Sequence, residues 1–219
     1  MGRLQHCSLL SRVGRGLSTV SLGKVHGRIN NSMKYLRLFE NRLESLKRLV
    51  DLGLADLPQE LIDYLDGPGT GNLNLSNSPV RELPPGLEVG GSLYLSGSAI
   101  ESLPDGLKVD GNLFLNGTPI RELPPGLEVG DGLYLRGAKE LKRLPAGLDV
   151  GGKVDLTFSG VESLPDGLRV LGDLSLGGTP IKRLPSGLLV IGNLWLEQTS
   201  ITELPPDLRV RGKIIGFGA

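Results

Sequence analysis

The residue types that carry out catalysis or bind metals are scarce in this chain of 219 residues. Its two histidines and its one cysteine (His6, His26 and Cys7) all lie in the first 32 residues. The rest of the sequence therefore has no imidazole or thiol for a catalytic triad or a zinc site, and no phosphate-binding loop of the form G-x-x-x-x-G-K-[ST]. A single cysteine also excludes an internal disulfide. We expect no enzymatic activity, no metal and no other cofactor.

Carboxylates recur at one position of the sequence, directly before a Leu-Pro pair. Two carboxylates that face each other across a cleft could act as acid and base in sugar hydrolysis. Basic side chains alternate with them, however, which is typical of a solvated charged edge. We therefore interpret the whole set as one edge of a repeat structure. The carboxylates are Glu82, Glu122 and Glu203, and the basic residues are Arg81, Arg121, Lys142 and Arg183.

A repeat accounts for this regularity. Leu-Pro pairs begin at residues 83, 103, 123, 144, 164, 184 and 204, so the spacing is 20 residues with one step of 21. Each unit reads L-P-x-G-L-x-V-x-G-x-L-x-L-x-G-T-x-I-x-x, and we expect the extra residue in a loop over 138–141. The 33 glycines and 15 prolines, which would indicate disorder without a period, recur at fixed positions. Glycines such as Gly106, Gly111 and Gly117 should form the corners.

The L-x-L step of each unit has the period of a β-strand. One unit buries too little apolar surface to offset the entropy lost on ordering its backbone, so the units must stack to fold. We expect parallel strands stacked in a ribbon, with Leu93 and Leu95 pointing inward and Tyr94 outward. The middle residues of the L-x-L steps then form an outward row: Asn74, Tyr94, Phe114, Tyr134, Asp155, Ser175, Trp195 and Ile215.

The outward row is the candidate functional site. It holds four of the nine aromatic residues of the chain, and three of them fall on adjacent predicted strands. Exposed aromatic side chains are typical of binding surfaces, although aromatics also suit strands and stack across them. Flanking outward positions should add a polar rim, with Ser92, Asn112, Lys153, Asp173 and Asn193 on one side and Ser96, Asn116, Arg136, Thr157 and Glu197 on the other. The predicted site consists of Tyr94, Phe114, Tyr134, Asp155, Trp195, Asn112, Asn116 and Arg136.

The repeat resembles the short leucine-rich repeats of bacterial and phage proteins, whose core is L-x-x-L-x-L-x-x-N-x-L. The stretch Leu113-x-Leu115-x-x-Thr118-x-Ile120 matches the later part of that core. The resemblance implies an α/β-type repeat solenoid, a leucine-rich-repeat arc with a parallel β-ribbon on its concave side and an N-terminal helical-hairpin cap. The first leucine of the core is not kept, and a hydroxyl stands in place of the asparagine. We expect that hydroxyl to bond the backbone of the neighbouring coil, at Ser78, Ser98, Thr118, Ser159, Thr179 and Thr199.

Three regions follow from these patterns: a basic leader over 1–32, an α-helical cap over 33–70 and the repeats over 71–219. The leader is rich in arginine and has no Asp or Glu, which fits a mitochondrial transit peptide, a disordered leader, or sequence upstream of a true start at Met33. The spacing of apolar residues predicts one helix from Tyr35 to Val50 and a second, short one over 58–66. We expect a cytoplasmic protein, or a mitochondrial one if the leader is a transit peptide.

The sequence favours a non-enzymatic protein-protein interaction module that binds its partner through the concave strand face. The alternative is a structural protein of a virion or cell-surface array that associates end to end through an uncapped C-terminal strand. A surface-binding or ice-binding solenoid is a weaker third hypothesis. The 24 basic and 24 acidic residues balance, so nucleic acid is not expected as a partner. No apolar run approaches the roughly 20 residues that span a bilayer.

Overall fold

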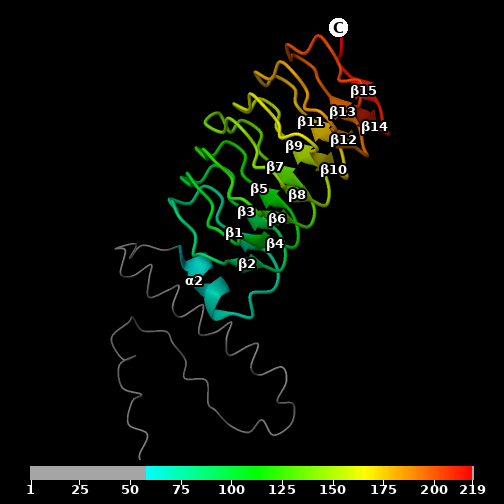
Figure 1. Ribbon diagram of the computed structural model, residues 1–219. Helices are drawn as coiled ribbons and strands as arrows, with labels where there is room; N and C mark the ends of the chain where they lie inside the picture. Colours follow the sequence, from blue (N-terminus) through cyan, green and yellow to red (C-terminus); the bar gives the residue numbers. More distant parts are fainter. Residues whose placement is uncertain (1–57, 219) are drawn as a thin grey trace, which may run out of the picture. The chain divides into compact units, whose positions relative to one another are not determined.

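The computed structural model describes residues 58–218, and the predicted leader, the choice of start and the first helix lie outside these residues. Within them the chain forms a parallel-strand β-solenoid of about seven turns, each of about 20 residues. The predicted L-x-L strands are confirmed and pair in chain order (Figure 1). We call this eight-stranded sheet the first ribbon. Its strands are β1 (Leu73–Asn74), β3 (Leu93–Tyr94), β5 (Leu113–Phe114), β7 (Leu133–Tyr134), β9 (Val154–Asp155), β11 (Leu174–Ser175), β13 (Leu194–Trp195) and β15 (Ile214–Ile215).

A second strand in each turn, at the x-V step, was not predicted. These strands form a four-stranded and a three-stranded parallel sheet, which together we call the second ribbon. The α/β-type expectation is therefore only partly right, because the described turns hold strands and loops. The recurring proline and glycine of the L-P-x-G step disfavour a helix there. The strands are β2 (Glu88–Val89), β4 (Lys108–Val109), β6 (Glu128–Val129), β8 (Asp149–Val150), β10 (Arg169–Val170), β12 (Leu189–Val190) and β14 (Arg209–Val210).

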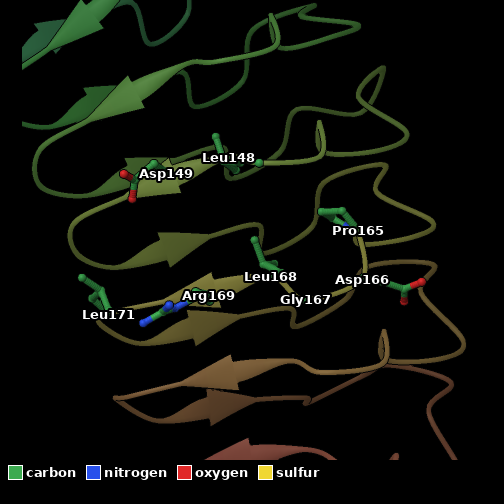
Figure 2. A pocket seen from close by; sticks show the side chains of 9 residues that line it. Leu148, Asp149, Pro165, Asp166, Gly167, Leu168, Arg169 and Leu171 are labelled. Carbon is green, nitrogen blue, oxygen red and sulfur yellow. The ribbon is translucent and has the colours of Figure 1, made fainter.

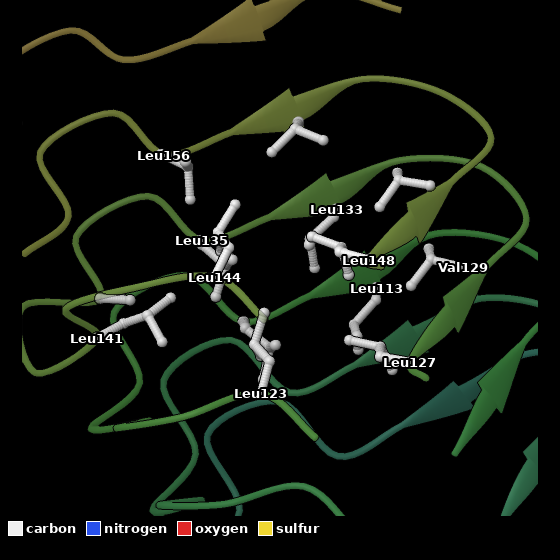
Figure 3. Packing of buried hydrophobic residues seen from close by; sticks show 14 of the residues in the cluster. Leu113, Leu123, Leu127, Val129, Leu133, Leu135, Leu141, Leu144, Leu148 and Leu156 are labelled. Atoms are coloured by element: carbon white, nitrogen blue, oxygen red, sulfur yellow. The ribbon is translucent and has the colours of Figure 1, made fainter. Parts of the chain in front are cut away.

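The core lies inside the coil, between the two ribbons and the loops that join them. Figure 3 shows leucines of successive turns, among them Leu113, Leu127 and Leu133, gathered there. Ala138 and Leu141 are fully buried on either side of the extra residue, which adds a turn at 139–140, as expected for an insertion in a loop. The six aliphatic positions of the unit are buried in every turn but the last, for example Leu103, Leu107, Val109, Leu113, Leu115 and Ile120.

The glycines serve two purposes. Gly106 and Gly117 turn the chain with φ of +71° and +66°, the left-handed region that glycine enters freely. Gly111 was expected to do the same but does not. A β-carbon at Gly111 would lie 2.7 Å from the Ser92 Oγ and 2.9 Å from the carbonyl carbon of Gly91. This glycine therefore lets successive turns approach closely.

Helix α2 (Gln59–Asp66) precedes the first turn and matches the second predicted helix. Pro58 precedes it, and Leu61 and Leu65 are buried in the same apolar cluster as the repeats. The Tyr64 hydroxyl donates a hydrogen bond to the carbonyl oxygen of Gly69 at 2.5 Å and accepts one from the backbone N–H of Gly90 at 3.1 Å. One side chain therefore joins the helix to the first full repeat. In the described part of the chain, no helix has the length and apolar character needed to cross a membrane.

Candidate functional site

Three aromatic rings form a stack on the outward face of the first ribbon. Tyr94, Phe114 and Tyr134 pair in register on neighbouring strands, as predicted. The ring centres of Tyr94 and Phe114 are 4.8 Å apart at an interplanar angle of 10°, and those of Phe114 and Tyr134 are 4.6 Å apart at 13°. All three are half-buried, and neither tyrosine hydroxyl has a hydrogen-bond partner among the described residues. We call these three residues the aromatic stack. Their rings pack face to face and each ring keeps part of its surface exposed.

The outward row changes character after the stack. Asp155 follows Tyr134, and its Oδ1 accepts hydrogen bonds from the Thr157 backbone N–H at 3.0 Å and the Thr157 hydroxyl at 2.6 Å. Its Oδ2 lies 3.2 Å from the Lys153 Nζ. Burial by itself raises the pKa of Asp155, but the bonds from Thr157 and Lys153 outweigh it and hold the pKa below its usual range. Its carboxylate is therefore charged and already bonded.

Trp195 is separated from the aromatic stack. It lies on β13, and Ser175, which is buried, stands between it and Asp155 in the row. The structure therefore does not bring Trp195 into contact with the other aromatics of the predicted site. The contiguous part of the site ends at Asp155.

Half of the ten polar residues predicted as a rim accept a backbone N–H of the next turn. The Asn112 Oδ1 accepts the N–H of Gly132 at 2.9 Å, and the Asn116 Oδ1 accepts the N–H of Arg136 at the same distance. Such bonds satisfy backbone groups between the turns, so these rim side chains also link successive turns. The polar ladder, as we call it, comprises Asn72, Ser92, Asn112, Asp173 and Asn193.

The serine and threonine hydroxyls that stand in place of the asparagine of leucine-rich repeats were expected to bond the backbone of the neighbouring turn, and four of them bond their own turn instead. The Thr118 Oγ1 donates to the carbonyl oxygen of Leu115 in its own turn at 2.8 Å, and not to the neighbouring turn. A hydroxyl sits on the β-carbon and reaches less far than an asparagine amide, so it bonds the nearest carbonyl. Ser78, Thr118, Thr179 and Thr199 all make this bond.

Phe158 is a surface residue that the sequence analysis missed. It occupies the position of Gly137 and Gly178 in the adjacent turns, and its φ of +57° is rare for a bulky residue. The side chain is 40% exposed. The Arg136 guanidinium lies 5.6 Å from the ring centre and the Lys139 Nζ lies 5.9 Å from it. An aromatic residue at a repeat position that otherwise favours glycine was the signal available in the sequence.

The repeated charged edge carries ion pairs between successive turns. Arg121 lies 3.7 Å from Glu101, and Lys142 lies 3.6 Å from Glu162. Both pairs are exposed, so each adds little stability. The carboxylates Glu82, Glu122 and Glu203 are exposed as well. Within 58–218 no group of three or more His, Cys, Asp or Glu is placed to hold a metal ion.

The second ribbon is interrupted between β8 and β10, which do not pair. A surface pocket of about 440 Å³ lies at this interruption. Figure 2 shows Arg169 and Leu171 at one end of it with Asp149, and Pro165 and Asp166 at the other. Leu171 is 49% exposed. The pocket is open, and its carboxylates lie at its two ends, so it offers no paired acid and base.

No protein-family model matches the chain, and no curated protein matches it.

Proposed function

We propose that this protein is a non-enzymatic protein-protein interaction module that binds its partner over the aromatic stack. The observation that carries the proposal is the half-exposed row of Tyr94, Phe114 and Tyr134 on three neighbouring strands. Large aromatic side chains that keep an exposed edge are enriched among the residues that dominate binding energy. The hydroxyls of the two tyrosines have no hydrogen-bond partner within residues 58–218 and can bond to a bound chain.

The surroundings of the stack favour tight binding because they hold it in place. The strand N–H groups beside the rings donate to the next turn, for example Leu95 to Phe114 at 2.8 Å and Leu115 to Tyr134 at 2.7 Å. Asn112 adds a side-chain bond between the turns. A rigid surface loses little conformational entropy when a partner binds.

We further propose that the solenoid is of the leucine-rich-repeat kind, with the first ribbon on its concave side. The L-x-L strands and the inward aliphatic positions support this. In this proposal residues 33–70 form a helical cap and 71–219 form the repeat array. Leu61 and Leu65 of α2 support the cap, because they extend the apolar core of the repeats.

The test replaces Tyr94, Phe114 and Tyr134 together by alanine in the full-length chain. A matched control carries three alanines on the second ribbon of the same turns, at the exposed positions Glu88, Lys108 and Glu128. Proteins retained by each chain on affinity beads would be identified by mass spectrometry. We expect a partner that is retained by the wild type and the control and lost by the aromatic variant.

Both variants would first be checked by circular dichroism and thermal unfolding, so that loss of folding is not mistaken for loss of binding. The proposal is contradicted if the folded aromatic variant retains every protein that the wild type retains. Loss of the same partner by the control would also count against the aromatic stack as the site.

A further inference from the structure

Two cations and one aromatic ring form a cluster beside the aromatic stack. Arg136 and Lys139 each lie within 6 Å of the centre of the Phe158 ring, at 5.6 and 5.9 Å. We call these three residues the cation cluster. Arg136 comes two residues after Tyr134, and its backbone carbonyl still accepts the N–H of Gly117 at 2.9 Å. Arg136 therefore still takes part in the backbone hydrogen bonds that join the turns along the first ribbon.

The positive charges of the cluster are not neutralised within the described residues. Lys153, on the same face, has Asp155 at 3.2 Å, whereas neither Arg136 nor Lys139 forms an ion pair there. Glu140 follows Lys139 in the chain but does not reach ion-pair distance. An aromatic ring attracts a cation and holds it in place without cancelling its charge. Both cations are exposed and remain available to an anion.

The outward positions around the aromatic stack carry no carboxylate in the first four turns. Arg136 is the single charged residue among them. In the fifth turn the carboxylate of Asp155 is paired with Lys153 at 3.2 Å, so the face that presents the aromatics keeps positive character at that end. A partner that covers this face and carries a carboxylate at that end would match it in charge. The positions are Asn72, Asn74, Ser76, Ser92, Tyr94, Ser96, Asn112, Phe114, Asn116, Gly132, Tyr134 and Arg136.

The backbone at Phe158 is unfavourable for the residue it carries. Glycine occupies this position in the turns on either side, where φ is +73° at Gly137 and +66° at Gly178. The Phe158 ring lies against Gly178, where a β-carbon would not fit. A bulky side chain held in a left-handed conformation is often found at a functional site. Here its ring lies within 6 Å of both the Arg136 guanidinium and the Lys139 Nζ.

We propose that the cation cluster binds a carboxylate of an acidic peptide segment in the partner. This inference rests on the proposed function, because it assigns a chemistry to the partner that covers the aromatic stack. Arg136 and Lys139 supply the charge, and Phe158 positions them.

The test uses hexaglutamate as the probe and the full-length chain labelled with ¹⁵N. Hexaglutamate, hexaglutamine and inorganic phosphate are titrated at constant ionic strength while the backbone amide signals are followed. We expect saturable shifts at Arg136, Gly137, Lys139 and Phe158 with hexaglutamate, and none with hexaglutamine. In the double variant Arg136→Gln/Lys139→Gln the dissociation constant should rise at least about fivefold.

The matched control is Lys182→Gln/Arg183→Gln, which removes the same charge from two exposed residues outside the cluster. Its dissociation constant should stay within about twofold of the wild type. Unchanged binding by the Arg136/Lys139 variant, or equal loss in the control, would overturn the proposal. Equal shifts with phosphate at matched charge would overturn the assignment to an acidic peptide.

The aromatic triple variant separates this inference from the proposed function. If that variant retains every partner yet still binds hexaglutamate at Arg136 and Lys139, only the proposed function fails. If partner capture depends on the aromatics but hexaglutamate does not bind, only the cation cluster fails.

Discussion

The ring of Tyr134 lies against the backbone of Gly132, two residues earlier on the same face of the first ribbon. A β-carbon at Gly132 would lie 2.7 Å from the Tyr134 Cε2 and 3.0 Å from its Cζ, so no larger residue fits without moving the ring. Gly132 occupies the repeat position that Ser92 and Asn112 occupy in the two preceding turns, where their side chains belong to the polar ladder. The polar ladder is therefore interrupted at the turn where the ring of Tyr134 takes up the space of a side chain, and it resumes at Asp173.

Replacing Gly132 by alanine should displace the Tyr134 ring and lower the free energy of unfolding by about 1–3 kcal/mol, as overpacking commonly does. Urea denaturation would measure the loss. In the Tyr134→Ala background the same substitution should cost at least about 0.5 kcal/mol less, because the ring is gone. Part of the cost will remain, since the new β-carbon also approaches the Asn112 Oδ1 at 2.9 Å. Equal costs in both backgrounds would show that the ring is not what excludes a side chain.

Asn112→Ala should be more destabilising than Asn116→Ala. Each side chain accepts one backbone N–H of the next turn at 2.9 Å, but the bond to Gly132 is partly buried and that to Arg136 is exposed. An N–H left without a partner costs about 1–3 kcal/mol when buried, whereas water replaces the acceptor at the surface. Asn112→Ala also removes a long hydrogen bond of 3.5 Å from the Asn112 Nδ2 to the Ser92 Oγ, which adds to its cost, and the two variants can be compared in one urea series. An equal loss for both would mean that burial does not set the value of the ladder.

Asp155→Asn should lower stability more near neutral pH than in acid. The pKa of Asp155 is lower in the folded chain than its usual value, so the charged carboxylate stabilises the fold at any pH above the unfolded pKa of about 4. That contribution is lost as the pH falls through the folded pKa. We expect a loss of about 1 kcal/mol near pH 7 and a smaller loss near pH 3, below the unfolded pKa. Urea unfolding at the two pH values would measure it, and an equal loss at both would contradict the assignment.

Phe158→Gly should be more stable than Phe158→Ala by about 1 kcal/mol, because glycine alone adopts a φ near +57° without strain. Both variants remove the ring, so the comparison isolates the backbone. Thermal unfolding of the two proteins would provide the measurement. If the Phe158→Ala variant is as stable as the Phe158→Gly variant, the turn relaxes and position 158 carries no strain. Hexaglutamate binding should fall in both variants.

Much of the fold could be predicted from the repeat. The inward positions of the turns and the pairing of Tyr94, Phe114 and Tyr134 follow from a period of two within each strand and of 20 between turns. The second ribbon could not be predicted in this way, because its two-residue strands carry one buried residue each, as Lys108–Val109 does. A single buried valine has no period to detect.

The site was predictable only in its outline. The row of aromatics could be read from the L-x-L steps, but whether the rings stack depends on the distance between turns. The cation cluster escaped notice because Phe158 lies one turn after Arg136 and Lys139 and shares a repeat position with neither of them. The destination of the Thr118 hydroxyl was predicted wrongly, since the reach of a side chain against the local turn decides it.

By itself the sequence determined which residues face inward and which strands are neighbours. The reason is that a slip of one residue would turn every inward leucine outward, so hydrophobic burial allows one register. Only the tertiary structure decided where the polar side chains bond, where a ring excludes any residue but Gly132, and which cations meet Phe158. Those outcomes depend on distances of a few ångströms within a turn or between neighbouring turns. The repeat pattern carries no information about such distances.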